Sequence, residues 1–219
     1  MTPFFRLAIL ASACLVLSGP AAASGDPAMD GQVMRINNQW AHIRYQIADR
    51  DKQYEQLAAL AQQAAQVAAR YPNRAEPLLW QGIVVSEEAA RANVFKQLGL
   101  ATSARDILTR AYALNPKVAD GGAAMSLGVL YYKVPGFPLG FGSTKKARAY
   151  FEAALRQDPA GLDNNFFYGD FLNSEGDKVG ARQYLTRALK APVDARRPVW
   201  DAGRRAEIRV LLAKIAKGS

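Results

Sequence analysis

Cysteine and histidine each occur only once among the 219 residues. A lone cysteine, Cys14, cannot form an intrachain disulfide, and zinc and haem sites need several ligands of these two kinds. The single histidine, His42, lies in a helical pattern beside Trp40, where a surface or packing role is expected. We therefore predict that the protein has no metal site and no cofactor.

The short motifs of nucleotide-binding and hydrolytic enzymes are also missing. The sequence contains no GxGxxG, no Walker loop and no HExxH. Gly136–Gly142 is rich in glycine, but it lacks the lysine and hydroxyl groups that phosphate sites use. Adjacent acids such as Glu87 and Glu88 point in different directions on a helix, so they cannot work together as acid and base. We predict that the protein is not an enzyme.

Apolar runs long enough to cross a bilayer are absent, because Leu7–Leu17 is shorter than the ~20 residues that are needed. This run follows Arg6 and precedes Gly19-Pro20 and Ala21–Ala23, which is the anatomy of a secretory signal. We predict a signal peptide over residues 1–23, cleavage near Ala23, and a soluble periplasmic or secreted protein. A lipoprotein attached through Cys14 is the alternative, since Ala11–Cys14 loosely matches a lipobox.

Acidic residues are outnumbered by basic ones. Residues 1–23 hold one arginine and no acid, so the mature chain would carry 27 basic and 19 acidic residues, a net charge of +8. This excess favours acidic partners, including anionic membrane surfaces, although most of the charge is spread along the chain. Nucleic acid is not expected as a partner of an exported protein.

Alternating strand patterns are absent too, and a helical pattern recurs three times instead. Paired alanines lie seven residues apart at 104 and 111, 147 and 154, and 181 and 188. A glycine precedes each pair (Gly82, Gly128 and Gly169) and a proline follows it (Pro116, Pro159 and Pro192). Small residues let two helices approach closely, and proline ends the second helix. The 34 residues from Ala147 to Ala181 are typical of stacked helical hairpins that share one core.

These signals divide the mature chain into four parts. We predict a flexible N-terminus over 24–31, a helical pair over 32–74 that breaks near 49–51, about three repeats over 75–192, and a C-terminal cap helix over 193–219. In the first repeat we expect a helix over 75–97 that ends at Gly99, with Thr102 and Ser103 capping the next helix.

One segment interrupts the repeats. Residues 134–142 replace a tight turn, and their two prolines and three glycines prevent both helix and strand. The segment nevertheless carries Phe137, Leu139 and Phe141. Two interpretations remain open: the loop forms an aromatic lip on a binding groove, or it folds back and covers the core.

These residues resemble the tetratricopeptide repeat (TPR) family in its secreted bacterial form. The resemblance implies an all-α solenoid of helical hairpins that binds a partner and has no chemistry of its own. More narrowly, Val134–Gly142, Lys146–Arg148 and Asp163–Leu172 resemble proteins related to the T-component of TRAP transporters. That likeness implies a periplasmic protein that oligomerises and binds a hydrophobic ligand or a solute-binding protein. Gln81, where the family has an apolar residue, and two insertions depart from the pattern.

We therefore predict a scaffold that binds a protein or peptide partner on the face formed by the first helices. The alternative is a TRAP T-component-like accessory protein that binds a small apolar ligand, for which an apolar tunnel beside Phe137 and Phe141 would be evidence. The candidate contacts are aromatic: Tyr131, Tyr132, Phe137, Phe141, Phe167, Tyr168 and Phe171.

A cluster of arginines near the C-terminus has two interpretations. As an exposed basic patch it would hold an acidic partner or anionic lipid, and the protein would be an envelope-surface component. As the polar outer face of a terminal helix it would close the repeat array. The residues concerned are Arg196, Arg197, Arg204, Arg205 and Arg209.

Overall fold

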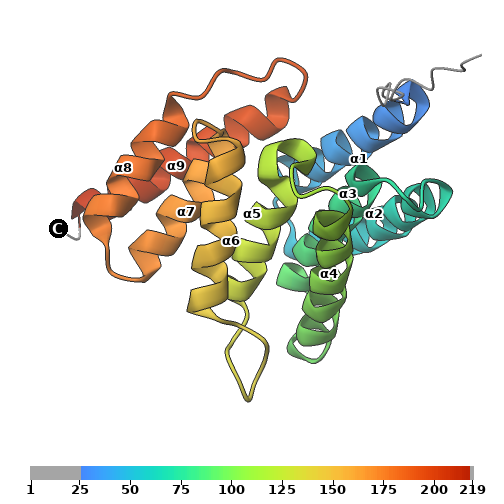
Figure 1. Cartoon of the computed structure of the whole chain (residues 1–219), viewed down its shortest axis with the longest axis horizontal. Coiled ribbons are helices and arrows are strands. Elements are labelled where there is room, and N and C mark those ends of the chain that lie inside the picture. The colour runs from blue at the N-terminus through green and yellow to red at the C-terminus, as the bar shows by residue number, and fades with distance from the viewer. Residues whose placement is uncertain (1–25, 218–219) are drawn as a thin grey trace, which may run out of the picture.

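The computed structural model describes residues 26–217, over which the chain forms nine α-helices and no β-strand (Figure 1). This confirms the all-α prediction. The predicted signal peptide, Cys14 and the cleavage site near Ala23 lie outside the described residues. The helices are α1 Pro27–Gln46, α2 Arg50–Arg70, α3 Ala75–Arg91, α4 Val94–Leu114, α5 Val118–Lys133, α6 Thr144–Gln157, α7 Leu162–Ser174, α8 Lys178–Leu189 and α9 Pro198–Lys217.

The first helix begins earlier than the sequence suggested. We expected 24–31 to be flexible, but α1 starts at Pro27. Asp26 caps it by accepting hydrogen bonds from the backbone nitrogens of Ala28 and Met29, at 3.0 and 3.1 Å. The Met29 side chain is fully buried. A capping bond contributes about 1 kcal/mol, and the buried methionine adds hydrophobic stabilisation, so this segment is ordered.

The boundary between α3 and α4 also differs from the prediction. The helices meet at residues 92–93 instead of near Gly99, and Asn93, not Thr102 or Ser103, is the cap. The Asn93 Oδ1 accepts a hydrogen bond from the backbone nitrogen of Lys96 at 3.2 Å. Gly99 lies inside α4 in open space, where a glycine weakens a helix without ending it.

Close packing of the repeat hairpins depends on the three predicted glycines. A Cβ on Gly82 would lie 2.5 Å from Leu108 Cγ, and one on Gly128 would lie 2.7 Å from Phe151 Cδ1. A Cβ on Gly169 would lie 2.9 Å from Leu185 Cγ. In each case the glycine faces a large side chain four residues after the first alanine of the pair. All six paired alanines are fully buried.

The helices form two layers (Figure 1). The inner helices α1, α3, α5, α7 and α9 contact one another in a closed circuit, because α9 packs against both α7 and α1. Within residues 26–217, the outer helices α2, α4, α6 and α8 each pack only against their two sequence neighbours. We predicted a C-terminal cap helix over 193–219 and, in one interpretation, a polar outer face on it that carries the arginine cluster. In the structure α9 also closes the circuit, and Arg204 is only 1% exposed, so Arg204 does not belong to an outer polar face.

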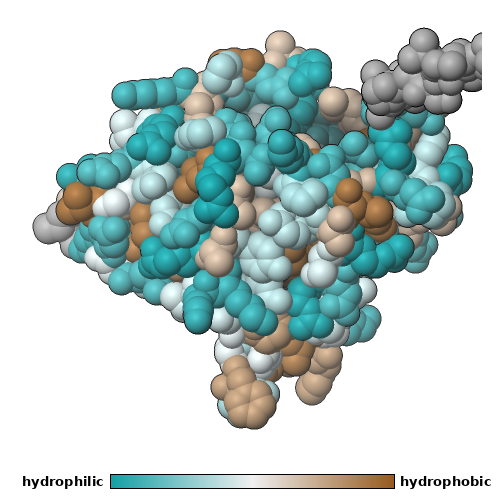
Figure 2. Space-filling view, viewed as in Figure 1, coloured by the Kyte–Doolittle hydropathy of each residue, from teal (hydrophilic) through white to brown (hydrophobic). Residues whose placement is uncertain are grey.

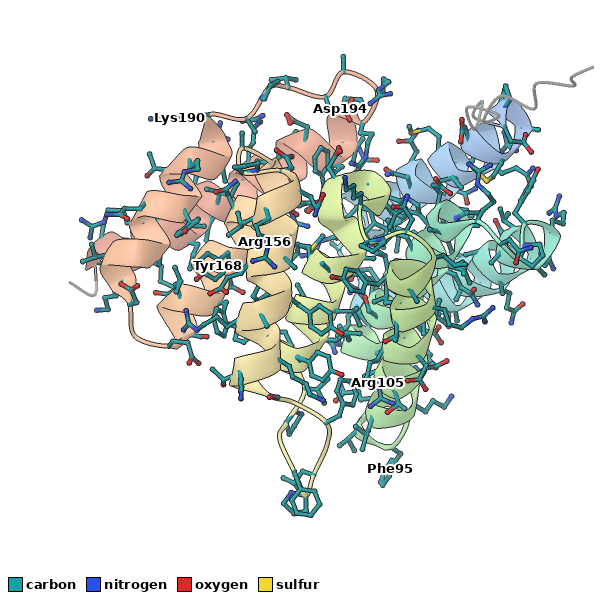
Figure 3. All side chains as sticks on the ribbon, in the orientation of Figure 1. Phe95, Arg105, Arg156, Tyr168, Lys190 and Asp194 are labelled. Carbon is teal, nitrogen blue, oxygen red and sulfur yellow. The ribbon has the colours of Figure 1, made fainter. Side chains whose placement is uncertain are left out.

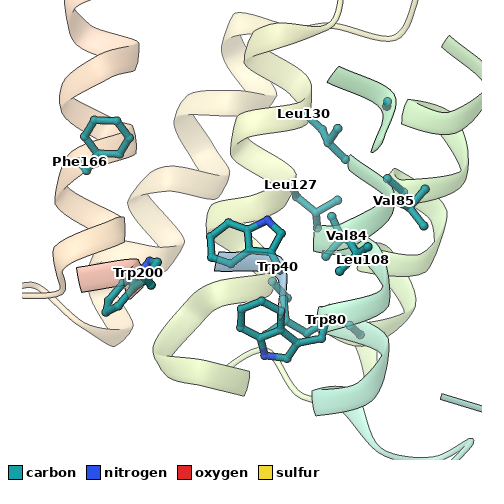
Figure 4. Packing of buried hydrophobic residues seen from close by; sticks show 14 of the residues in the cluster. Trp40, Trp80, Val84, Val85, Leu108, Leu127, Leu130, Phe166 and Trp200 are labelled. Carbon is teal, nitrogen blue, oxygen red and sulfur yellow. The ribbon is translucent and has the colours of Figure 1, made fainter. Parts of the chain in front are cut away.

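One large core extends through the stack, and Ala124, Met125 and Ala154 form a small second cluster. Buried residues from every helix, from Ile36 to Ile215, belong to one contiguous hydrophobic cluster. Figure 4 shows part of it, with Trp40 and Trp80 next to each other and Leu127 close by. No helix of residues 26–217 is both long and apolar enough to cross a membrane.

Candidate functional site

A cavity of about 280 Å³ lies where the inner helices converge, and we call it the central pocket. Each inner helix contributes to its lining. Trp40 comes from α1, Trp80 from α3, Met125 from α5, Phe167 from α7 and Trp200 from α9. The closed circuit of helices therefore creates this pocket, since no single hairpin could supply all of its walls.

The pocket has an aromatic wall. The chain has three tryptophans, Trp40, Trp80 and Trp200, and all three line it. The rings of Trp40 and Trp80 meet edge to face with centroids 5.7 Å apart. The indole nitrogen of Trp40 is buried and has no hydrogen-bond partner among residues 26–217. A buried donor of this kind would gain free energy from an acceptor on a bound molecule.

Arg197 brings a positive charge to the same wall. Its guanidinium lies 3.8 Å from the Trp200 ring centroid and 5.6 Å from that of Trp80. The Arg197 Nε donates a hydrogen bond to Asn37 Oδ1 at 2.9 Å, and its terminal nitrogens bind no atom of the described residues. Burial lowers the pKa of Arg197, opposed by Asp163 and Asp194, although arginine stays charged at neutral pH. The unused donors suit a carboxylate or a carbonyl oxygen.

Arg204 and Asp163 form a partly buried ion pair in the lining of the pocket. The Arg204 Nε lies 2.7 Å from Asp163 Oδ1, and the Trp200 Nε1 donates to Asp163 Oδ2 at 3.2 Å. The Arg204 guanidinium also lies over the Phe167 ring at 4.5 Å. Burial alone would lower the pKa of Arg204, but Asp163, Tyr45 and Glu207 together raise it. These contacts fix the positions of Trp200 and Phe167.

A second group of charges joins α1 to α3 and α9. Arg44 donates from Nη1 to Glu87 at 2.8 Å and from Nη2 to Glu207 at 2.6 Å. Burial would raise the pKa of Glu87, but Arg44 and Arg91 outweigh it and lower the pKa. Burial raises the pKa of Tyr45 to about 12, opposed by Arg204 and Arg44, so its hydroxyl stays protonated and donates to Glu207 at 3.2 Å.

The start of α5 adopts an unusual backbone conformation beside the pocket. Ala119 and Asp120 have φ angles of 46° and 54°, in the left-handed region that residues other than glycine rarely occupy. The side chain of Asn164 holds this turn by donating to the Asp120 carbonyl at 3.1 Å. Ala119 and Asp120 both line the pocket. Strained backbone of this kind is concentrated at binding sites, where the surrounding contacts maintain it.

The predicted aromatic contacts are scattered, and only Phe167 lines the central pocket. Tyr168 and Phe171 are core residues, 7% and 0% exposed. Tyr132 packs edge to face against Phe171, with centroids 5.6 Å apart. Tyr131, likewise half-buried, stacks on Tyr150.

The loop over 134–142 shows features of both interpretations. Phe141 folds back onto Tyr131, with ring centroids 5.6 Å apart. Phe137 and Leu139 instead project from the molecule and are 94% and 74% exposed. Neither Phe137 nor Phe141 lines the central pocket, so the apolar tunnel expected beside them for a transporter accessory protein is not this cavity.

The arginine cluster is not a continuous basic patch. Arg204 is buried, and Arg205 binds Asp201 and donates to the carbonyls of Leu189 and Ala191, which end α8 and begin the following loop. Arg196 and Arg209 are exposed. The cluster was misjudged because a helical arginine facing its own molecule has the same sequence signature as one facing solvent.

Several pocket residues were not predicted as contacts, above all Trp40, Trp80, Trp200 and Asp163. Tryptophan is rarer in this sequence than phenylalanine or tyrosine, and its three copies all line the pocket. Nothing in the local sequence indicates that residues so far apart meet at one site. His42 lies outside the pocket, where its Nδ1 lies 2.5 Å from Gln46 Oε1. Among residues 26–217, no group of three or more histidine, cysteine or acidic side chains is placed to hold a metal ion.

A solved structure decides the class of this architecture. TTC0263, described as a thermophilic TPR protein from Thermus thermophilus, aligns with a TM-score of 0.55 and 14% sequence identity, covering 84% of this chain and 98% of that one. The fold is that of a tetratricopeptide-type helical solenoid. No family model matches the sequence, and no curated protein does. The TPR-like fold is thus established by architecture, and the comparisons lend no support to the TRAP alternative.

Proposed function

We propose that this protein is a non-catalytic periplasmic scaffold that holds a segment of a protein partner in the central pocket. The TPR-like fold is commonly an interaction scaffold, which supports the general role. The observation that carries the proposal is the convergence of all five inner helices on one pocket. Residues far apart in sequence are held there by partly buried ion pairs, as a preformed binding site requires.

The size and lining of the pocket suit part of a larger partner. A volume of about 280 Å³ lies at the lower limit of the roughly 300–1,000 Å³ of typical small-molecule sites. One or two side chains of a peptide would fill it. The lining is also mixed, since charged groups such as Arg197 and Asp120 lie beside the tryptophans. A purely apolar ligand would leave these charged groups without compensation.

The chemistry of the wall indicates how the segment would be held. An aromatic or aliphatic side chain would pack against Trp40 and Trp80. A carboxylate or carbonyl oxygen would accept hydrogen bonds from the unused nitrogens of Arg197. We therefore expect a segment with a single carboxylate placed at Arg197 to bind better than a neutral or basic one, because an ion pair adds attraction between opposite charges to the hydrogen bond. A segment with several carboxylates would be repelled, since the pocket is also lined by acids: Glu87, Asp120, Asp158, Asp163 and Asp194.

Intrinsic fluorescence tests this directly, because every tryptophan of the chain lines the pocket. The protein would be titrated with hexapeptides of equal length that carry a single acidic side chain, a single basic one or neither. We expect the singly acidic peptides to change the emission, and Arg197→Gln to weaken their binding about tenfold or more. The matched control is Arg196→Gln, since Arg196 is exposed and lies outside the pocket. No emission change with any peptide, or equal losses in both variants, would refute the proposal.

The periplasmic location is a separate part of the proposal and has its own test. It rests on the anatomy of residues 1–23 described above. Expression of the full chain in a bacterium, followed by fractionation and N-terminal sequencing, should give a periplasmic protein that begins at Ser24. Fatty-acid labelling that depends on Cys14 would establish the lipoprotein instead. An uncleaved chain in the cytoplasm would refute export.

A further inference from the structure

Exposed apolar side chains gather at one end of the molecule, away from the central pocket. Figure 1 shows the loop between α5 and α6 projecting from the lower end, and Figure 3 places Phe95 at that same end. Figure 2 shows hydrophobic residues there, beyond a more polar body. We call this surface the apolar tip. It comprises Val94, Phe95, Leu98, Phe137 and Leu139, with exposed fractions of 73%, 94%, 42%, 94% and 74%.

The two halves of the tip are in contact and well ordered. A Cβ on Gly140 would lie 3.4 Å from Leu98 Cδ1, so the loop lies against the start of α4. The loop is held by its own hydrogen bonds, including Gly142 N to Pro135 O at 2.8 Å and Leu139 N to Gly136 O at 3.0 Å. Phe141 anchors its base against Tyr131. The tip is therefore a preformed projection.

The charge around the tip is mostly positive. The two segments that build it, 89–105 and 121–151, contain no aspartate or glutamate. Their basic residues include Lys96, Lys145 and Lys146, which are exposed and form no ion pair among residues 26–217. Nearby acids neutralise part of the charge. Asp170 on α7 pairs with Lys133, Asp106 on α4 itself pairs with Arg105, and the Glu88 carboxylate interacts electrostatically with Lys96.

We infer that the apolar tip docks on an anionic lipid bilayer. Exposed phenylalanine and leucine side chains on a convex projection match the boundary between lipid headgroups and acyl chains, where such apolar groups leave water. The three lysines around them match anionic headgroups, which attract each nearby basic residue. A protein groove would also accept an apolar prong, but five residues are few against the roughly 20–30 residues that each side of a stable protein interface contributes. This inference is independent of the central pocket.

Vesicle flotation tests the inference with the protein as it exists after export. Vesicles would contain phosphatidylcholine alone or phosphatidylcholine mixed with phosphatidylglycerol. We expect flotation with the mixed vesicles only, and weaker flotation as salt rises. Phe95→Ser with Phe137→Ser should weaken binding at least about tenfold, because two phenylalanines that enter the bilayer are lost. Replacing Lys96, Lys145 or Lys146 by glutamine should weaken vesicle binding about fivefold for each lysine that is replaced.

The matched control is Val179→Ser with Val210→Ser, two valines that are 71% and 69% exposed elsewhere on the surface. This pair should leave flotation unchanged, and circular dichroism would verify that every variant is folded. The inference is overturned if the wild type does not float with anionic vesicles, or if both pairs of variants lose binding equally. It is also overturned if the Phe95→Ser/Phe137→Ser variant floats as the wild type does but has a lower mass in sedimentation. In that case a second copy of the chain covers the tip of the wild-type protein.

Discussion

The contact between α1 and α9 closes the circuit of inner helices, and Gly203 makes that contact tight. A Cβ on Gly203 would lie 2.5 Å from Tyr45 Cγ and 2.7 Å from Tyr45 Cε1. The Tyr45 ring cannot easily move away, because its hydroxyl binds Glu207 and its edge meets Trp40 with centroids 6.3 Å apart. Gly203→Ala should therefore push α9 away from α1.

The expected magnitude follows from two opposing terms. Overpacking a filled site costs about 1–3 kcal/mol. Replacing glycine by alanine inside a helix contributes about 1 kcal/mol in favour of folding. Because the added Cβ would meet three ring carbons of Tyr45, the cost lies in the upper part of that range, at about 2–3 kcal/mol. We therefore expect a net loss of about 1–2 kcal/mol in the free energy of unfolding, and a melting temperature lower by about 2–8 °C. The tryptophan emission should shift to longer wavelength as the central pocket opens.

Gly99→Ala is the matched control, because Gly99 also lies in a helix but has no atom within 4 Å of its added Cβ. It should stabilise the protein by about 1 kcal/mol. Both variants would be compared by thermal and urea unfolding monitored by circular dichroism. In a Tyr45→Ala background the penalty of Gly203→Ala should vanish. If Gly203→Ala stabilises the protein as much as Gly99→Ala, the reasoning about the closed circuit is wrong.

Three further predictions concern stability. Phe151→Ala should lower the free energy of unfolding by about 3–5 kcal/mol in urea, since its ring is 1% exposed and fills the space opposite Gly128; a loss below about 1 kcal/mol would contradict this packing. The folded-state pKa of Glu87 is below its ordinary 4.5, so the contribution of Glu87 to folding stability is complete above pH 4.5 and is lost as the pH falls through the folded-state pKa. Glu87→Gln should therefore flatten the dependence of stability on acid pH. An unchanged pH profile would exclude Glu87 as the source of that dependence. Because the pKa of Tyr45 is raised from 10.0 to about 12, stability should fall by about 3 kcal/mol at most as the pH rises through that interval, and the fall should be absent in Tyr45→Phe; the same fall in that variant would assign it to another group.

The helices and their pairing into hairpins could be predicted from local sequence. Gly82, Gly128 and Gly169 and the paired alanines indicate close approach, because small residues at helical spacing permit it whatever the rest of the chain does. The helix ends were less certain. Gly99 suggested a stop and Asn93 did not stand out, since a cap depends on the conformation of the residue as well as on its type.

The central pocket was decided by tertiary structure alone. Each hairpin is rotated slightly relative to the previous one, and the sum of these rotations brings α9 back to α1. No local sequence pattern predicts the total rotation between the first and the last helix. That rotation is nevertheless what buries Arg204, pairs Arg44 with Glu207 and gathers Trp40 and Trp200 around one cavity. The sequence by itself determined a stack of helical hairpins with a shared core. Closure of the stack determined which polar and aromatic side chains face one another.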